Sequence, residues 1–241
     1  MLSLNSGIMP IASNWMPLEK PSVLLELFTS QGCSSCPPAD ALLAKLHQEA
    51  EVGGLPLVAL SFHVDYWNRL GWKDPYSQAQ FSDRQRTYAK KLQSLQVYTP
   101  QLVVNGQSGH IGSREQEVRK AILKQKKPKQ EGIVLKIDNR KNGNFSFYYQ
   151  IDDKSASFTL NVALVRPSVG NTVSKGENRG RTLKHVQVVM AFKSQDLTDS
   201  SGVVQIDFSE SLIDKEDQIV CFLQRTDTWA VEGIQVFGQI N

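Results

Sequence analysis

The sequence lacks any apolar run that approaches the roughly 18 residues needed by a membrane-spanning helix, so we expect no transmembrane segment. It also lacks a strong charge of either sign, since 27 Lys and Arg residues oppose 24 Asp and Glu residues and the formal net charge is +3. So small a charge, with scattered basic residues, argues against a nucleic-acid partner. Hydrophobic residues make up 40% of the 241 residues, which excludes overall disorder.

Cysteine is scarce, because the chain contains only three. Three cysteines cannot build a disulfide framework or a four-cysteine zinc site, so at least one is unpaired within the monomer. Cys33 and Cys36 enclose two serines, whereas Cys221 lies in the strand-like apolar run Ile219–Leu223. A cysteine in such a run is expected to fill space in a core. The Cys-Ser-Ser-Cys pair is therefore the functional candidate among the cysteines.

Two breaks divide the chain. Residues 1–20 start without Lys or Arg, and polar residues, Gly and Pro interrupt their apolar run. They therefore do not match a secretory signal peptide, and we expect a weakly ordered N-terminal tail. The second break is the basic stretch Lys124–Lys129, where like charges repel and Pro128 ends the preceding helix. We therefore predict two domains, at residues 21–128 and 129–241.

The first domain alternates buried strands with amphipathic helices. Its pattern predicts, in order, a strand at 23–29, a helix after Cys36, a strand at 57–62, a helix at 77–95 and a strand at 101–104. A tight hairpin turn is predicted at Asn105–Gly106. The last helix is predicted to begin at Ser113, with Gln116 as its capping-box partner. Two strand–helix–strand crossovers predict a mixed, partly parallel sheet with helices on both faces.

The second domain is predicted to contain only β-strands. Apolar residues alternate with a period of two in several segments. The strand candidates are Ile133–Asp138, Phe145–Ile151, Ser157–Val165, Val186–Phe192, Val203–Phe208, Ile219–Leu223 and Ala230–Phe237. Short strands with turn residues between them predict an antiparallel sandwich.

A long polar loop is predicted between Arg166 and Leu183. Loops of that length are uncommon unless they are functional or disordered. We therefore hypothesise that Glu177, Asn178 and Arg179 dock against the first domain or against a partner.

The Cys-x-x-Cys pair is placed where the first strand enters its helix. A helix N-terminus carries unsatisfied N–H groups and partial positive charge, which favour a thiolate over a thiol. This position makes Cys33 the attacking, more exposed sulfur and Cys36 the resolving thiol. Pro37 and Pro38 bias the residue before them away from the helical conformation, so we expect Cys36 at the very start of the helix or just before it.

Two other interpretations of the cysteine pair stay open. The pair is half of a possible zinc site, although no residues are spaced as a second chelating pair. The candidates for that second half are Cys221, His47, His63, His110 and His185. A purely structural disulfide is the other interpretation, but closing so short a loop removes little chain entropy and stabilises little. We therefore predict a redox pair with no metal and no bound cofactor.

Several blocks of residues carry a resemblance to a known family, and together they span most of residues 22–181. The blocks are Glu26–Asp40, His63–Trp67, Leu70–Pro75, Tyr98–Gln101, Val104–Gly106 and Gly176–Arg181. With them the chain resembles the thioredoxin-like superfamily, and more narrowly the DUF1223 family of bacterial thioredoxin-like proteins, which are often described as secreted. The resemblance implies a thioredoxin-like fold and a periplasmic or secreted location.

The resemblance also implies a substrate groove beside the cysteines. In thioredoxin-like proteins a cis-proline precedes the third strand, and Thr99–Pro100 occupies the matching place. An X–Pro bond has a cis penalty of only about 0.5–1 kcal/mol. The implied role of Pro100 is to leave the backbone of Thr99 free to pair with an extended substrate chain. Both residues are therefore predicted to bind substrate.

His63, Asp65 and Trp67 follow the second strand, at the sheet edge where ligands of open α/β folds gather. We predict that they belong to the same substrate site, with His63 and Asp65 as polar groups near Cys33 that accept a proton in the resolving step. The alternative is that the two polar side chains bind loop backbone groups while Trp67 covers the core.

Taken together, these patterns predict an α/β thioredoxin-like domain followed by an all-β antiparallel sandwich domain. The predicted function is a thiol–disulfide oxidoreductase with catalytic residues Cys33 and Cys36. Its partner is a disulfide- or thiol-containing protein or a low-molecular-weight thiol. The alternatives are a non-catalytic binding or scaffold protein with the same fold and, less favoured by the spacing, a metal-binding module.

Overall fold

The computed structural model describes residues 23–53, 55–125, 133–141, 143–153 and 155–238. The predicted N-terminal tail and the predicted domain boundary at residues 128–129 lie outside the described residues. No helix in the described ranges has both the length and the apolar character that crossing a membrane would require.

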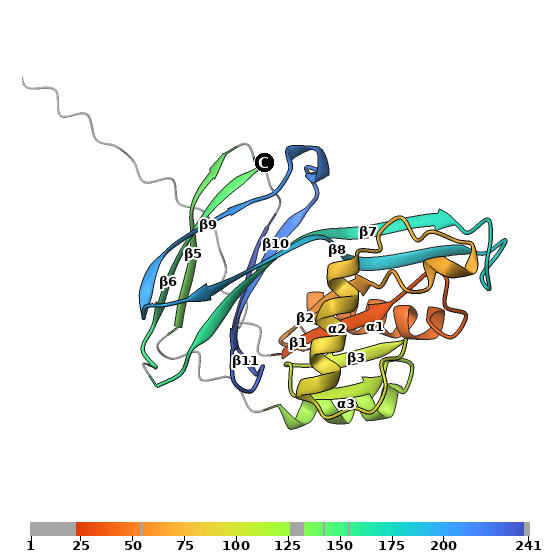
Figure 1. Cartoon of the computed structure of the whole chain (residues 1–241), viewed down its shortest axis with the longest axis horizontal. Helices are drawn as coiled ribbons and strands as arrows, with labels where there is room; N and C mark the ends of the chain where they lie inside the picture. Colours follow the sequence, from red (N-terminus) through yellow and green to blue (C-terminus); the bar gives the residue numbers. More distant parts are fainter. Residues whose placement is uncertain (1–22, 54, 126–132, 142, 154, 239–241) are drawn as a thin grey trace, which may run out of the picture.

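Helices and strands alternate in the first half, and strands dominate the second (Figure 1). The helices are α1 (Pro37–Glu51), α2 (Ala79–Lys91) and α3 (Glu115–Lys124), with short 3-10 turns η1 (Asn68–Leu70) and η2 (Glu210–Leu212). The strands are β1 (Val23–Thr29), β2 (Leu57–His63), β3 (Gln101–Val104), β4 (Ser108–Ile111), β5 (Ile133–Lys141), β6 (Asn144–Ile151), β7 (Phe158–Thr172), β8 (Thr182–Leu197), β9 (Ser201–Asp207), β10 (Gln218–Arg225) and β11 (Val231–Phe237). Each predicted strand corresponds to an observed one.

The helix ends differ from the prediction in detail. Helix α2 is shorter than the predicted span of residues 77–95 at both ends. The predicted capping box at the start of α3 is wrong, because the N-cap residue is Arg114 and no side chain caps the helix. Ser113 contributes its backbone instead, since its carbonyl accepts a hydrogen bond from the Glu115 N–H group.

The described strands form a mixed sheet of eight and an antiparallel sheet of three. Their orders are β11-β10-β7-β8-β2-β1-β3-β4 and β5-β6-β9. Strand β1 pairs in parallel with β2 and antiparallel with β3. Helices α1 and α3 pack on one face of β1, and α2 packs on the opposite face. The predicted mixed sheet with helices on both faces is therefore confirmed.

The predicted long loop between β7 and β8 is wrong, because both strands extend far beyond their apolar segments. Strand β7 continues to Thr172 and β8 begins at Thr182, so the connecting loop is only residues 173–181. The extended part alternates intermediate and exposed residues, and its Gly, Pro and polar side chains resemble loop composition. Figure 1 shows this hairpin extending from the side of the three-stranded sheet to the side of the helices.

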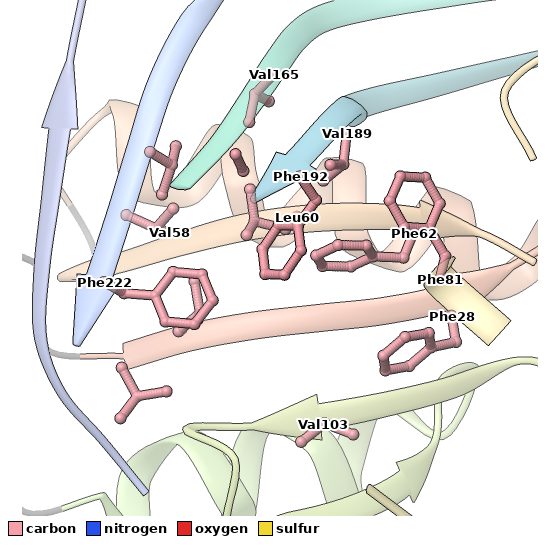
Figure 2. Packing of buried hydrophobic residues seen from close by; sticks show 14 of the residues in the cluster. Phe28, Val58, Leu60, Phe62, Phe81, Val103, Val165, Val189, Phe192 and Phe222 are labelled. Atoms are coloured by element: carbon pink, nitrogen blue, oxygen red, sulfur yellow. The ribbon is translucent and has the colours of Figure 1, made fainter. Parts of the chain in front are cut away.

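The two halves share a hydrophobic core around the ring of Phe62 (Figure 2). Its ring centroid lies 5.5 Å from that of Phe28, 5.2 Å from Phe81 and 5.5 Å from Phe192. Phe192 on β8 also contacts Phe222 on β10, at 6.2 Å. Because β8 and β10 belong to the second half, the rings join that half directly to β1, β2 and α2.

A second core lies between the three-stranded sheet and the facing side of β7 and β10. Cys221 is part of it, with none of its surface exposed. Burial raises the pKa of its thiol, which keeps the group neutral and unreactive. The prediction that Cys221 fills space in a core is therefore confirmed.

Candidate functional site

Cys33 and Cys36 form a disulfide at the start of α1. Cys36 is the N-cap residue, with φ −78° and ψ −38°, and Pro37 and Pro38 follow as the first two helical residues. The predicted position of Cys36 at the helix start is therefore confirmed. Because proline has no N–H group, this helix start offers fewer free donors to a thiolate than an ordinary one.

The prediction that Cys33 is the exposed sulfur is wrong, because neither cysteine has any exposed surface. The Ser35 hydroxyl lies 3.3 Å from Cys33 Sγ. Trp67 packs against the backbone just before the cysteine, since a Cβ added to Gly32 would come within 3.1 Å of the Trp67 Cβ. The two cysteines are therefore covered by their surroundings although Ser34 and Ser35 between them are exposed, and sequence spacing does not reveal this cover.

Loop 173–181 supplies part of that cover. The side-chain amide of Asn178 donates to the carbonyl oxygens of Gln31 and Cys33, at 2.9 Å each. Asn178 itself is completely buried. The hypothesis that Asn178 docks against the first half is therefore confirmed.

Glu177 docks beside it through its carboxylate, which accepts a hydrogen bond from the Ser34 N–H group at 2.9 Å. Hydrogen bonds from the side chain and backbone of Ser34 lower the pKa of Glu177. Arg179 behaves differently, because it is exposed and its side chain makes no hydrogen bond or ion pair within the described part of the chain. The docking hypothesis holds for Glu177 and fails for Arg179.

Thr99, Pro100 and Trp67 lie close to one another. The Thr99–Pro100 bond is cis. The Trp67 indole N–H donates to the Thr99 hydroxyl at 2.7 Å. The Pro100 carbonyl accepts a hydrogen bond from the Gly112 N–H group at 2.9 Å, so the loop before β3 is tied to the end of β4.

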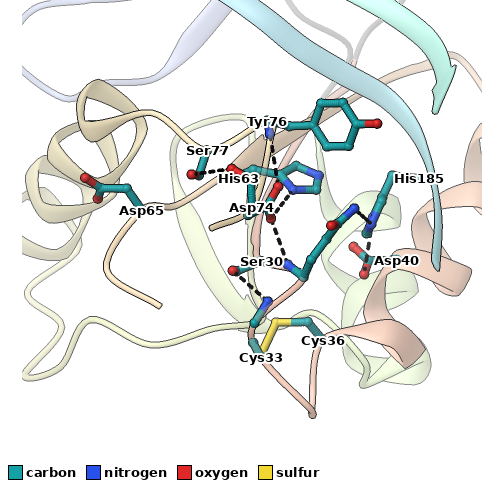
Figure 3. Close-up of polar contacts among 12 residues, drawn as sticks. Ser30, Cys33, Cys36, Asp40, His63, Asp65, Asp74, Tyr76, Ser77 and His185 are labelled. Atoms are coloured by element: carbon teal, nitrogen blue, oxygen red, sulfur yellow. Dashed lines mark hydrogen bonds and ion pairs between the residues drawn. A yellow bond between two sulfur atoms is a disulfide. The ribbon is translucent and has the colours of Figure 1, made fainter. Parts of the chain in front are cut away.

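The structure brings Asp74, rather than Asp65, to His63. His63 Nδ1 lies 2.7 Å from an Asp74 carboxylate oxygen, and both side chains are completely buried. Asp65 instead accepts a hydrogen bond from the Ser82 hydroxyl on α2, at 2.5 Å. Figure 3 shows Asp65 set apart from this pair and from the disulfide.

A second buried pair faces the first. His185 on β8 lies with Nδ1 3.5 Å from a carboxylate oxygen of Asp40 on α1, and its ring centroid is 4.6 Å from that of His63. Gln31 links the two pairs, because its N–H group donates to Asp74 at 2.8 Å and its side-chain amide is 3.2 Å from His185 Nε2. The four titratable residues lie beside the segment that leads to the cysteine pair (Figure 3).

Three buried atoms of this four-residue cluster have no hydrogen-bond partner among the described residues. They are Asp40 Oδ1, His63 Nε2 and His185 Nδ1, the last of which has only the ion-pair contact with Asp40 at 3.5 Å. Buried polar atoms are nearly always hydrogen-bonded, and exceptions gather at functional sites. Asp40 has a sequence signal, since it follows Cys36 by one helical turn; His185 has none, because its place depends on where β8 enters the sheet.

Asp74 makes the cluster pH-sensitive. Burial disfavours its carboxylate, but the His63 ring and hydrogen bonds from His63 and the Gln31 and Tyr76 N–H groups outweigh burial and lower its pKa. A carboxyl group with a lowered folded-state pKa stabilises the fold above its ordinary pKa of about 3.9, and this contribution is lost as the pH falls through the folded-state pKa.

We therefore expect Asp74→Asn to lower the free energy of unfolding by about 2 kcal/mol at neutral pH, because buried hydrogen bonds to a charge are lost. The difference from wild type should shrink as the pH falls below about 4. Urea unfolding at about pH 7 and about pH 3 measures this, with Asp65→Asn as the matched control. A difference equal at both pH values would contradict the role of the Asp74 charge.

No group of three or more His, Cys, Asp or Glu side chains within the described ranges is arranged to hold a metal ion. His47 lies on α1 beside Gln187, and His110 lies on β4 beside Ser108. His47 and His110 are thus outside the four-residue cluster.

Comparisons with known proteins place these features in one family. The family model described as "Protein of unknown function (DUF1223)" matches residues 24–224. Among solved structures, the chain is similar to the crystal structure of protein AGR_C_4864 from Agrobacterium tumefaciens, with 25% identity over 92% of this chain and 98% of that chain and a TM-score of 0.71. No curated protein matches the sequence. The family match includes the cysteine pair, the four-residue cluster and loop 173–181.

Proposed function

The chain belongs to the DUF1223 family, and we propose that it is a thiol–disulfide oxidoreductase whose redox centre is the Cys33–Cys36 pair. The observation that carries this proposal is the disulfide at the start of α1 together with the buried side chains of Asp40, His63, Asp74 and His185, which lie beside the segment that leads to it. A cross-link that closes so short a loop stabilises little. Buried clusters of titratable groups are enriched at functional sites. Both arguments favour redox chemistry over a structural disulfide.

In the proposed reaction the reduced protein transfers two electrons to a substrate disulfide. The Cys33 thiolate attacks one substrate sulfur, the substrate S–S bond breaks, and the leaving thiolate takes up a proton. The Cys36 thiol then loses its proton and attacks Cys33 Sγ, so that the Cys33–Cys36 bond forms and the second substrate thiolate leaves, to be protonated. A thiol-containing protein or a low-molecular-weight thiol restores the dithiol by the reverse steps.

The proposal assigns the Cys36 proton to the cluster of Asp40, His63, Asp74 and His185. Asp40 follows Cys36 by four residues, and residues so spaced lie on the same side of a helix. Its free carboxylate oxygen is a buried acceptor within the described part of the chain, and His63 Nε2 is one when the neutral ring carries its proton on Nδ1, towards Asp74. A positioned carboxylate or imidazole is a suitable general base for the resolving step.

The finer fold assignment is also part of the proposal. We infer a thioredoxin-like domain over residues 21–128 and a β-sandwich domain over residues 129–241. The mixed sheet, the cysteine pair at the start of α1 and the packing of the three-stranded sheet on β7 and β10 support it. A periplasmic or secreted location agrees with this chemistry, because disulfides persist in oxidising compartments.

One observation favours a second candidate function. Both cysteines are completely buried, whereas exchange requires that a thiolate reach the disulfide. A non-catalytic binding or scaffold protein with the same fold has no such requirement. The two candidates therefore differ in whether the pair exchanges at all.

The deciding experiment equilibrates the full chain with glutathione redox buffers and measures both the potential of the pair and the reduction of insulin disulfides. We expect turnover and a potential between roughly −270 and −120 mV, the range of known redox-active pairs. A potential below about −300 mV without turnover would favour the scaffold protein. Stoichiometric copurifying metal would instead favour a metal-binding module.

A further inference from the structure

Loop 173–181 is built as a closed unit at the end of the β7–β8 hairpin. The Val173 N–H group donates to the Arg181 carbonyl at 2.9 Å, and the Gly180 N–H group donates to the Val173 carbonyl at 2.8 Å. Val173 is completely buried. Arg181 also donates to the side-chain oxygen of Asn178, at 2.9 Å, which orients the amide group of that residue. The loop therefore presents Asn178 in a defined position.

The contacts of this loop concentrate on the backbone around Cys33. Asn178 occupies the carbonyl groups of Gln31 and Cys33, and Glu177 occupies the N–H group of Ser34. The loop thus binds the residues on both sides of the cysteine, and it does so while the sulfur is in its disulfide form and completely buried.

Few hydrogen bonds hold the loop to the turn. The Glu177 bond is exposed, so water replaces it at little cost. The two Asn178 bonds are buried, and a buried donor or acceptor that loses its partner costs more. Asn178 is therefore the main anchor, and the loop is secured by one side chain from a distant part of the sequence.

We propose that Asn178 is a positioning residue of the Cys33–Cys36 pair and that loop 173–181, which it anchors, controls access to Cys33. With the loop docked, the turn keeps its disulfide conformation and no thiolate reaches Cys33; when the loop leaves, Cys33 becomes exposed and exchanges. The inference rests on the proposed function, because access matters only if the pair exchanges. It also reconciles redox chemistry with two buried cysteines.

Asn178→Asp is the sharpest test, because it keeps the shape of the side chain. It removes both N–H donors and places a carboxylate against the carbonyl oxygens of Gln31 and Cys33. The readout is the rate at which a water-soluble phosphine reduces the disulfide; the phosphine becomes its oxide with oxygen from water, and both cysteines become thiols. We expect at least about a tenfold faster reduction, the factor that one to two lost hydrogen bonds produce.

Arg179→Ala is the matched control, since Arg179 lies in the same loop, is exposed and makes no side-chain hydrogen bond or ion pair among the described residues. Its reduction rate should stay within about twofold of wild type. Glu177→Ala is the second variant, which remains informative if Asn178→Asp does not fold, because Glu177 is exposed. We expect about a threefold acceleration from the loss of its exposed hydrogen bonding to Ser34.

A positioning role predicts a further change that simple docking does not. Because Asn178 binds the turn in its disulfide form, its loss should move the equilibrium with glutathione about tenfold towards the dithiol. Unchanged reduction rates in both folded loop variants would overturn the proposal even if wild type turns over substrate. Faster reduction in a protein that never exchanges with insulin would sustain the access role and reject the oxidoreductase.

Discussion

Cys33→Ser is expected to abolish disulfide exchange, whereas Cys36→Ser stops the reaction one step later. A serine hydroxyl is not ionised at neutral pH and cannot replace the attacking thiolate, so we expect the rate to fall by at least about 10³-fold. In Cys36→Ser the attacking sulfur remains but nothing resolves the intermediate. That variant should therefore accumulate a mixed disulfide on Cys33.

Mass spectrometry after incubation with oxidised glutathione distinguishes the two variants. Cys36→Ser should carry one glutathione on Cys33, and Cys33→Ser should carry none. Cys221→Ala is the matched control, because Cys221 is buried in the second core. This variant should exchange at a rate within about twofold of wild type. A glutathione adduct on Cys36 of the Cys33→Ser variant would reverse the assigned roles.

Period-two alternation and continuous apolar runs are sufficient to predict the strands, but they do not predict which strands become neighbours. Strand β8 pairs with β7 along one edge and with β2 along the other, where Ser61 lies opposite Val188. Nothing local to either strand specifies this pairing. The polar ends of β7 and β8 are not predicted as strands for a related reason. Their composition is typical of a loop, but hydrogen bonds between the two strands keep the backbone extended.

The site shows the same division between local and long-range information. The cysteine motif and the place of His63 after β2 are visible in the sequence, because both depend on a strand end. The partner of His63 is not, since Asp65 is nearer in the sequence but bonds to α2, while Asp74 reaches the histidine from the following loop. A buried contact with the Cys33 carbonyl comes from Asn178, 145 residues away.

A buried ion pair of the first half lies at the centre of the shared core, against aromatic rings of the second half. The guanidinium of Arg84 on α2 donates to the Glu26 carboxylate on β1 at 2.6 and 3.1 Å, and Glu26 has no exposed surface. The Arg84 Cζ atom lies 4.9 Å from the Phe192 ring centroid and 5.4 Å from that of Phe222. Burial disfavours the charge, but Glu26 and Tyr88 outweigh burial and raise the pKa of Arg84.

Arg84→Met is therefore expected to lower the free energy of unfolding by about 3–5 kcal/mol, because it leaves the Glu26 carboxylate buried without its partner. Urea unfolding at neutral pH measures this loss. Arg119→Met is the matched control, since Arg119 pairs with Glu49 at a solvent-accessible site, where water screens the ion pair and its contribution to stability is small.

The double variant Glu26→Gln with Arg84→Met separates the cost of an unpaired charge from the loss of packing. Removing both charges should recover part of the stability, because the penalty of the isolated carboxylate disappears. The lost packing on Phe192 and Phe222 should remain in both variants. If Arg84→Met costs no more than Arg119→Met, the buried ion pair does not stabilise the shared core, and the packed rings alone must account for its stability.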